Sequence, residues 1–529
     1  MRNRLARGGG RCPALIVPTR RPRHLSQIGA SIPAFRFLDH GVKLMRQSLQ
    51  ASFLVLLLAG APALAEPATS EGAKALAESF ATYFGQSALD KGIINVAPQG
   101  EDYKVTVDLQ KLVDGQGLPP GDSVQIGAVS FLTSPQQGGA WKVAMSSFPS
   151  VSAHLSSPDG DVAGSFAVNG YKFDGVYDPK LASFLAAKGS ADLVDVKWTA
   201  KGTDVALQEA GFAFDVQSSD AGGGAVSVKA RNTIKSVSET VKVTSPAKQG
   251  APAQPVSIVY KLGPLSGDAT LEAMHSRGLL DLWAFLVAQQ GVEHVVEHQD
   301  ELKSRLKAIL PLWNSAKVDA SISDVSAGLP FGEVGLKSFG ERIGFSGLAS
   351  HGEFELGFKL DGPTFPAALL PSWSKPLLPS SLDADFKVTA EGLDQIARAL
   401  IDDLDLKATP PLSEASQGKL AAMWLGGHPR LVIGPGRLTS PSYAISVQGE
   451  LEMTKPKPSG RLTIEADGLD KTFATIQEAA KTTPMLQQAL AGLTFVKGLA
   501  KPAADGKPSW VIELGADGAV SVNGMKFGK

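Results

Sequence analysis

Apolar and polar residues alternate along much of the chain, as they do in strands that bury one side and expose the other. Residues 103–109 (Tyr-Lys-Val-Thr-Val-Asp-Leu) show this alternation clearly. Further strand-like segments, separated by Gly, Asp and Asn, lie at 141–145, 165–168, 193–198 and 212–216. Asn169 and Gly170 stand between two such segments, and both tolerate the positive φ that a type I′ turn needs. We therefore predict antiparallel sheet over residues 90–262.

Two segments have helical spacing instead. Leu76, Phe80 and Phe84 fall on one face of a short helix. Residues 277–312 are the most strongly helical part of the chain and predict two helices with a break near Gly291. Strand patterns then return, at 317–322, 352–360 and 382–390. The predicted fold class is α+β, predominantly antiparallel and elongated, with repeated sheet-plus-helix units and a helical segment between two β-rich halves.

The C-terminal half contains an internal repeat. Residues 386–395 (Phe-Lys-Val-Thr-Ala-Glu-Gly-Leu-Asp-Gln) resemble residues 462–471 (Leu-Thr-Ile-Glu-Ala-Asp-Gly-Leu-Asp-Lys), and an apolar-periodic segment follows each. Each copy predicts a strand, a glycine turn and a helix whose N-cap is Asp394 or Asp470. A duplicated structural unit is favoured over a paired acidic site built from these two residues.

Residues 45–65 have the pattern of a signal peptide. Arg46 supplies the positive start, residues 53–59 are apolar, and Ala63-Leu64-Ala65 is a small-x-small cleavage site. The apolar run is shorter than the roughly 20 residues that a permanent membrane span needs. We predict cleavage after Ala65 and no permanent transmembrane segment.

Residues 1–44 carry nine Lys or Arg and one acidic residue. We predict that they are an untranslated or non-structural leader and that translation begins at Met45; a transit peptide or basic arm is the alternative. The remaining chain divides into a β-rich half at 66–275, a helical segment at 276–313 and an α+β half at 314–529. Residues 245–255, which are polar and Pro-rich, predict a linker or a long hairpin turn. The apolar, Pro-rich segment 363–379 predicts packing on a sheet or against a groove.

The charge of the exported part differs from that of the whole chain. Residues 1–65 hold ten of the 51 Lys and Arg but one of the 52 Asp and Glu, which leaves 41 basic and 51 acidic residues. An acidic protein without a basic stripe is not expected to bind nucleic acid. The single cysteine, Cys12, lies in the leader, so the mature chain is disulfide-free and has neither a thiol nucleophile nor a cysteine metal site.

One motif carries specific chemistry. His294, Glu297 and His298 match the H-x-x-E-H arrangement in which two histidines on one helix face bind zinc and the glutamate activates the metal-bound water. Catalytic zinc also needs a third protein ligand, for which the candidates are Glu353, Glu355 and Glu391 at other spacings. On a helical wheel the motif's histidines lie on a polar face, and the predicted buried side consists of Val292, Val295, Gln299, Leu302, Leu306 and Leu310. A solvated helix face explains the motif equally well, and adventitious metal binding stays open.

Other enzyme signatures are weaker. Three S-x-x-K matches, beginning at Ser304, Ser372 and Ser416, lack the partner motifs of penicillin-binding enzymes. No Gly-x-Ser-x-Gly elbow is present, and the glycine pair around Pro435 lacks the third glycine of a dinucleotide loop. No cofactor is expected.

The segments at 370–373, 378–379, 382–386, 404–411 and 518–524 resemble an uncharacterised family of exported alphaproteobacterial proteins of unknown function. The resemblance covers the C-terminal 270 residues or so and implies a periplasmic location, but it supplies no activity. Together with the export signal, it favours a non-enzymatic envelope protein that binds an apolar ligand, a lipid or a protein partner. The alternative is a zinc-dependent hydrolase that uses His294, Glu297 and His298. No other ligand-binding residue is assigned, and a scaffold without a small-molecule ligand is a third hypothesis.

Overall fold

The computed structural model describes residues 68–527 except 115–116, 157–159, 245–254 and 454–456. These residues belong to one compact unit, 57–529. The expected leader, the expected signal peptide and nearly all of the expected linker at 245–255 lie outside the described residues.

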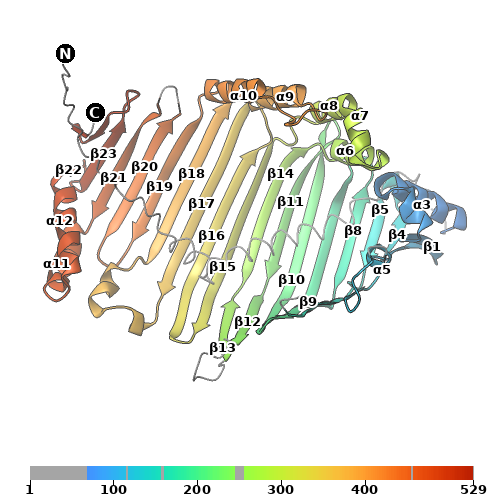
Figure 1. The fold of residues 1–529 in the computed structure, drawn as a ribbon, viewed down its shortest axis with the longest axis horizontal. Coiled ribbons are helices and arrows are strands. Elements are labelled where there is room, and N and C mark those ends of the chain that lie inside the picture. The colour runs from blue at the N-terminus through green and yellow to red at the C-terminus, as the bar shows by residue number, and fades with distance from the viewer. Residues whose placement is uncertain (1–67, 115–116, 157–159, 245–254, 454–456, 528–529) are drawn as a thin grey trace, which may run out of the picture. The chain divides into compact units, whose positions relative to one another are not determined.

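The strands form one antiparallel sheet, which has 25 strands in the described part of the chain. The predicted α+β, predominantly antiparallel fold is therefore confirmed (Figure 1). The first strands are β1 (Ile94–Gln99), β2 (Asp102–Val107), β3 (Ser123–Ile126), β4 (Val129–Pro135), β5 (Trp141–Met145), β6 (Val151–Leu155), β7 (Val162–Asn169), β8 (Lys172–Asp178), β9 (Ser183–Ala200), β10 (Thr203–Gly222), β11 (Ala225–Ile234), β12 (Ser236–Thr244), β13 (Pro255–Leu262) and β14 (Leu265–Met274). The later strands are β15 (Ser315–Leu329), β16 (Gly332–Ser346), β17 (His351–Thr364), β18 (Ser381–Glu391), β19 (Arg430–Thr439), β20 (Ala444–Glu452), β21 (Ser459–Asp467), β22 (Lys501–Pro502), β23 (Pro508–Leu514), β24 (Val520–Val522) and β25 (Met525–Phe527).

Helices interrupt the strands at a few places. The α-helices are α3 (Ser70–Phe84), α4 (Gln86–Asp90), α5 (Gln110–Asp114), α6 (Ser276–Ala288), α7 (Val292–Glu297), α8 (Gln299–Ala308), α9 (Leu393–Asp403), α10 (Glu414–Gly426), α11 (Leu469–Ala480) and α12 (Met485–Gly498). The 3-10 turns are η2 (Gln137–Gly139), η3 (Ala367–Leu369) and η4 (Ser372–Leu377). Helices α6 to α10 lie along one edge of the sheet, and α11 and α12 lie along another (Figure 1).

The lateral order of the strands has two branches. The main section runs β1, β2, β4, β5, β8, β9, β10, β11, β14, β15, β16, β17, β18, β19, β20, β21, β23, β24, β25. The short section runs β3, β6, β7, β9, β10, β12, β13, β15. The long strands β9, β10 and β15 belong to both sections, because each pairs with two different strands along its length.

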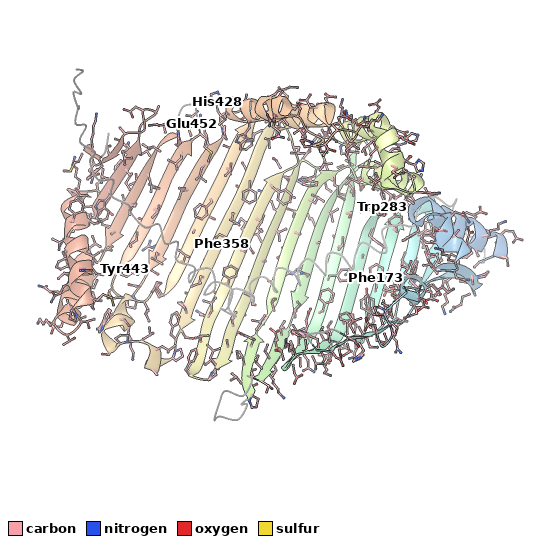
Figure 2. All side chains as sticks on the ribbon, viewed as in Figure 1. Phe173, Trp283, Phe358, His428, Tyr443 and Glu452 are labelled. Carbon is pink, nitrogen blue, oxygen red and sulfur yellow. The ribbon has the colours of Figure 1, made fainter. Side chains whose placement is uncertain are left out.

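The two sides of the sheet differ in polarity. One side, which we call the apolar face, carries Phe173 in β8, Phe214 in β10, Val318 in β15, Phe358 in β17 and Ile464 in β21, with their registered partners. Figure 2 shows Phe173 and Phe358 on the sheet. The alternation seen in the sequence thus becomes a continuous apolar surface, because side chains on a strand alternate between the two sides.

The opposite side, the polar face, carries ion pairs between neighbouring strands. Lys188 Nζ lies 3.2 Å from an Asp215 carboxylate oxygen, and Arg342 Nε lies 3.2 Å from one of Asp319. Arg430 and Glu450 are 3.2 Å apart in the same way. These side chains are at least 40% exposed, so the polar face is solvated.

A row of residues, which we call the seam, separates the main and short sections. There the apolar positions advance by three residues instead of two: Ala191 to Val194 in β9, Glu209 to Phe212 in β10, Ile322 to Val325 in β15 and Leu336 to Phe339 in β16. Gly211 and Asp324 lie in the seam with φ of 66° and 52°. The registers of β9 with β10 and of β15 with β16 continue unbroken across the seam, so the three-residue step departs from the two-residue alternation found on either side of it.

In the short section, burial falls toward the far ends of β12 and β13. Glu209 and Val237 are 8% and 7% exposed, whereas Val243 and Val256 at the far ends of β12 and β13 are each 36% exposed. The fully buried side chains are concentrated at the α3 end of the sheet and include Leu76, Val105, Val143, Tyr177 and Val226. The core therefore lies mainly where α3 covers the first strands.

The predicted repeat occurs in the structure, with one correction. Strand β18 is followed by α9 and strand β21 by α11, but the N-cap is Gly392 in one copy and Gly468 in the other. Both glycines have left-handed backbones, with φ of 75° and 72°. The prediction of an Asp N-cap was wrong, because each glycine already turns the chain and Asp394 and Asp470 then fall inside the first helical turn.

A third copy of this unit was not recognised in the sequence. Helices α6 to α8 join β14 to β15, just as α9 and α10 join β18 to β19, and α11 and α12 join β21 to β23. In each case the two joined strands are antiparallel neighbours. The helical segment therefore interrupts the chain but not the sheet, which continues directly from β14 to β15.

The Pro-rich segment 363–379 contains η3 and η4. Its Leu377 carbonyl accepts a hydrogen bond from Tyr443 Oη at 3.2 Å. Phe365 and Leu369 are 47% and 51% exposed. The expected packing is therefore present near Leu377, but the first part of the segment stays at the surface.

Candidate functional site

The H-x-x-E-H motif does not lie on one continuous helix. Helix α7 ends at Glu297, and His298 stands at the junction with α8 with φ −100° and ψ 27°. His298 Nδ1 lies 2.9 Å from the His294 carbonyl oxygen, and His294 Nδ1 lies 3.2 Å from Glu297 Oε2. The expected break near Gly291 is present, since α6 ends at Ala288. The motif thus lies on the short helix α7 and its junction with α8, and a second break separates α7 from α6.

The polar face expected for the motif is exposed, as predicted for a solvated helix. The His294 side chain is 60% exposed and the Glu297 side chain 66%. The assignment of Val292 to the buried side was wrong, because Val292 is 80% exposed at the start of the short α7.

The three glutamates considered as third zinc ligands interact with residues outside the H-x-x-E-H motif. Lys387 Nζ forms ion pairs with both Glu353 and Glu355 on the polar face, and its hydrogen bond lowers the pKa of Glu355. Glu391 lies 2.8 Å from His351 Nδ1. In the part of the chain that the structure describes, no three His, Cys, Asp or Glu side chains are grouped to hold a metal ion. The geometry gives no support to a zinc centre on this segment.

The apolar face is most open across β16, β17 and β18. Phe345 and Phe354 are direct cross-strand partners and are 37% and 45% exposed. Leu382 and Phe386 continue the surface on β18 and are 36% and 37% exposed. Large apolar side chains in adjacent rows thus remain partly in contact with solvent.

The charged residues of the apolar face are all acidic. In the main section the registers place Asp220 and Glu341 on it, and they place no Lys or Arg there among the described strand residues. Glu341 pairs across the strands with Ala320 and Phe358.

Glu209, in the short section, is an unusually buried acidic residue. It is 8% exposed and has Val194 and Val237 as cross-strand partners. Desolvation by burial raises the pKa of its carboxyl group. The sequence analysis did not identify Glu209. The signal was nevertheless present, because apolar residues alternate at Val205 and Leu207 of β10 and Glu209 is the next residue in that alternation.

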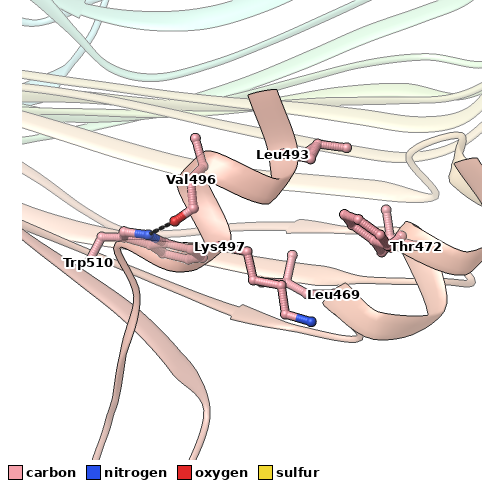
Figure 3. A pocket seen from close by; sticks show the side chains of 7 residues that line it. Leu469, Thr472, Leu493, Val496, Lys497 and Trp510 are labelled. Atoms are coloured by element: carbon pink, nitrogen blue, oxygen red, sulfur yellow. Dashed lines mark hydrogen bonds between the residues drawn. The ribbon is translucent and has the colours of Figure 1, made fainter. Parts of the chain in front are cut away.

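A small pocket lies between α11, α12 and β23 (Figure 3). It has a volume of about 40 Å³ and is lined by Leu469, Thr472, Phe473, Leu493, Val496, Lys497 and Trp510. Trp510 Nε1 donates a hydrogen bond to the Val496 carbonyl at 2.8 Å, which ties β23 to α12. Ligand pockets usually measure about 300 Å³ or more, so this one holds a few atoms at most.

In the described residues, no helix is long and apolar enough to cross a bilayer. Comparison with known proteins gives no match to any family model, to any curated protein or to any solved structure.

Proposed function

We propose that this protein is a non-enzymatic envelope protein of the periplasm that binds the hydrocarbon part of a lipid-like molecule on its apolar face. The observation that carries the proposal is the row of half-exposed Phe and Leu side chains on β16 to β18. An antiparallel sheet with one solvated side normally packs its apolar side on a core. Over these strands Phe345, Phe354, Leu382 and Phe386 are each a third or more exposed, so a ligand can supply the missing contacts.

The chemistry of the two faces supports hydrocarbon as the occupant. In the described strands of the main section the apolar face has neither Lys nor Arg, so it offers no cation to an anionic surface. The polar face uses its charges in ion pairs between its own strands, such as Arg342 with Asp319. Burial of alkyl chain against Phe and Leu side chains stabilises the complex by roughly 25 cal/mol per Å² of apolar surface.

The proposal is tested on neighbouring residues of β17 that point to opposite sides. Phe358 lies on the apolar face, with its ring 6.5 Å from that of Phe339, and Lys359 is exposed on the polar face. Binding of N-phenyl-1-naphthylamine, an apolar fluorescent probe, is measured for the wild type, Phe358→Asp and Lys359→Asp. We expect about a tenfold weaker affinity for Phe358→Asp and no change for Lys359→Asp, because about 1.4 kcal/mol of apolar contact is lost only from the first.

Native mass spectrometry of the protein purified without detergent complements this test. A lipid-sized adduct that organic solvent removes is the expected result. Circular dichroism shows whether Phe358→Asp folds; if it does not, Phe354→Asp replaces it, since Phe354 is 45% exposed and its loss disturbs packing less. Equal probe affinity in the wild type and in a folded apolar-face variant would overturn the proposal.

A further inference from the structure

Two neighbouring turns form an exposed apolar edge of the sheet, which we call the apolar rim. They are the β15–β16 hairpin turn, residues 329–332, and the first part of the Pro-rich segment, residues 363–374. A Cβ on Gly332 would lie 2.8 Å from Pro366 Cβ, so the two turns are in direct contact. Strands β15 and β17 run in the same direction, away from the end of α8, which places the rim at the edge opposite helices α6 to α10 (Figure 1).

The rim exposes large apolar side chains and carries no charge. Phe331 is 53% exposed, Phe365 is 47% exposed and Leu369 is 51% exposed. The two turns contain no Lys, Arg, His, Asp or Glu. Surface turns are ordinarily polar, because they face water. Clustered apolar side chains at such a position are found where a protein contacts a partner or a membrane.

Backbone hydrogen bonding in the rim favours a membrane over a protein as that partner. Several backbone donors are absent, because the rim contains Pro330, Pro363, Pro366 and Pro371. Others are used within the turns: the Leu369 N–H donates to the Pro366 carbonyl at 3.0 Å, and the Ser374 N–H donates to the Pro371 carbonyl at 2.9 Å. A protein partner needs about one hydrogen bond per 100–200 Å² of interface. Burial in hydrocarbon instead favours backbone whose donors are already satisfied or missing.

We propose that the apolar rim docks on the surface of a lipid bilayer, with Phe331, Phe365 and Leu369 inserted at the boundary between headgroups and acyl chains. This inference rests on the proposed function, because a bilayer then supplies or receives the lipid-like ligand. Large apolar side chains suit this boundary, into which docked elements sink by roughly 5–10 Å.

The rim is continuous with the apolar face. Segment 363–374 leads from β17 into β18, and the first apolar row of these strands pairs Leu360 with Leu382. Leu382 is 36% exposed, and it belongs to the open surface that the proposed function assigns to hydrocarbon. A protein docked through the rim thus holds the near end of this surface next to the bilayer.

The test is flotation of the purified protein with vesicles, made either of phosphatidylcholine alone or of phosphatidylethanolamine with phosphatidylglycerol. We expect the wild type to bind both kinds of vesicle. Phe365→Asp should lower the partition coefficient about tenfold or more, because it removes a large apolar side chain from the contact and adds a charge. Raising the salt concentration should change binding of the wild type by less than about threefold, since the rim carries no charge to be screened.

Val292→Asp is the matched control. Val292 is 80% exposed, more than any residue of the rim named above, but it lies in α7 at the opposite edge of the sheet. Its replacement should leave vesicle binding unchanged. If circular dichroism shows that Phe365→Asp does not fold, Leu369→Asp takes its place. Absence of vesicle binding by the wild type, equal binding by a folded rim variant, or binding that high salt abolishes would overturn the inference.

The two proposals fail in different ways. Affinity for N-phenyl-1-naphthylamine should be the same in the wild type and Phe365→Asp, because Phe365 lies outside the strands that carry the apolar face. A wild type that binds the probe but no vesicle would overturn only the docking. Binding to vesicles through the rim without any binding of the probe would contradict only the proposed function.

Discussion

The buried carboxyl group of Glu209 makes the stability of the ligand-free protein depend on pH. Its pKa is raised above 4.5 by desolvation, so the native state binds the proton more tightly than the unfolded state does. The free energy of unfolding therefore falls as the pH rises from about 4.5 through the raised pKa. Below 4.5 both states are protonated, and this loss is absent.

We expect Glu209→Gln to remove this pH dependence. Urea unfolding of the two proteins between pH 4.5 and pH 8 should give a difference in unfolding free energy that grows in favour of the variant as the pH rises. All other titratable groups are the same in the two proteins, so their contributions cancel in the comparison. Parallel pH profiles would contradict the expectation.

For single residues, the sequence predicted the exposure of some side chains correctly and that of others incorrectly. The exposed histidines of the H-x-x-E-H motif were assigned correctly to a solvated face. The buried Glu209 and the exposed Val292 were missed, because periodicity predicts which side of an element a residue occupies but not what covers that side. Burial depends on neighbours such as β9 and β12, which lie far away in the sequence or across a hairpin.

At the scale of elements, the two glycines that begin α9 and α11 offer a matched pair. Gly392 and Gly468 have nearly the same positive φ, 75° and 72°. A Cβ on Gly392 would meet nothing within 4 Å, whereas a Cβ on Gly468 would lie 2.1 Å from the Ser442 carbonyl oxygen. A comparison of alanine variants at the two sites thus distinguishes the cost of a left-handed backbone from the cost of steric overlap.

We expect Gly392→Ala to lower the free energy of unfolding by about 1–2 kcal/mol, the cost of left-handed backbone for a residue with a Cβ. Gly468→Ala should cost clearly more, because the backbone of Ser442 must also move. Chemical denaturation of both variants measures the two values. Equal losses would show that the turn around Ser442, between β19 and β20, can move without a cost in stability.

The repeat was recognisable in the sequence because a Gly-Leu-Asp string begins each of these two helices. The third copy escaped recognition, since β14 ends at Met274 and α6 begins at Ser276 without a glycine turn. The N-cap was misassigned for a related reason. Asp is a good N-cap in general, but here the glycine before it had already taken that position.

At the scale of the whole described unit, burial is unevenly distributed. The fully buried side chains cluster at the α3 end, in strands such as β2, β5 and β8. Strands β20 and β21 have mainly half-buried residues. Local opening is easier where few apolar contacts must be broken.

We expect hydrogen exchange to follow this gradient. Backbone amides of β2, β5 and β8 should exchange at least tenfold more slowly than those of β20 and β21 under native conditions, although all are paired in the sheet. Exchange measured by mass spectrometry on peptic peptides reports both regions at once. A saturating apolar ligand should slow exchange in β16 to β18 and leave β2 and β5 unchanged; uniform exchange rates along the sheet would contradict the expected gradient.

The sequence predicted strands but not their lateral order. The helical segment at 276–313 suggested a division between two halves, whereas β14 pairs directly with β15 and the sheet continues. The sequence also did not reveal the length of β9 and β10, or that each pairs with two successive strands along one of its edges. Alternation identifies a strand, but its partners are fixed by long-range packing.

The seam has a consequence for how the chain reaches this register. Strands β9 and β10 form a local hairpin around Lys201 and Gly202, and all the strands of both sections join the edges of this hairpin or of one another. A slip of the hairpin by two residues would preserve the simple alternation within each section. It would nevertheless move Gly211 away from the position where its missing side chain leaves room for Lys235. The interruption of the alternation thus destabilises misregistered strand pairings, which a sheet of this size with uninterrupted alternation would tolerate.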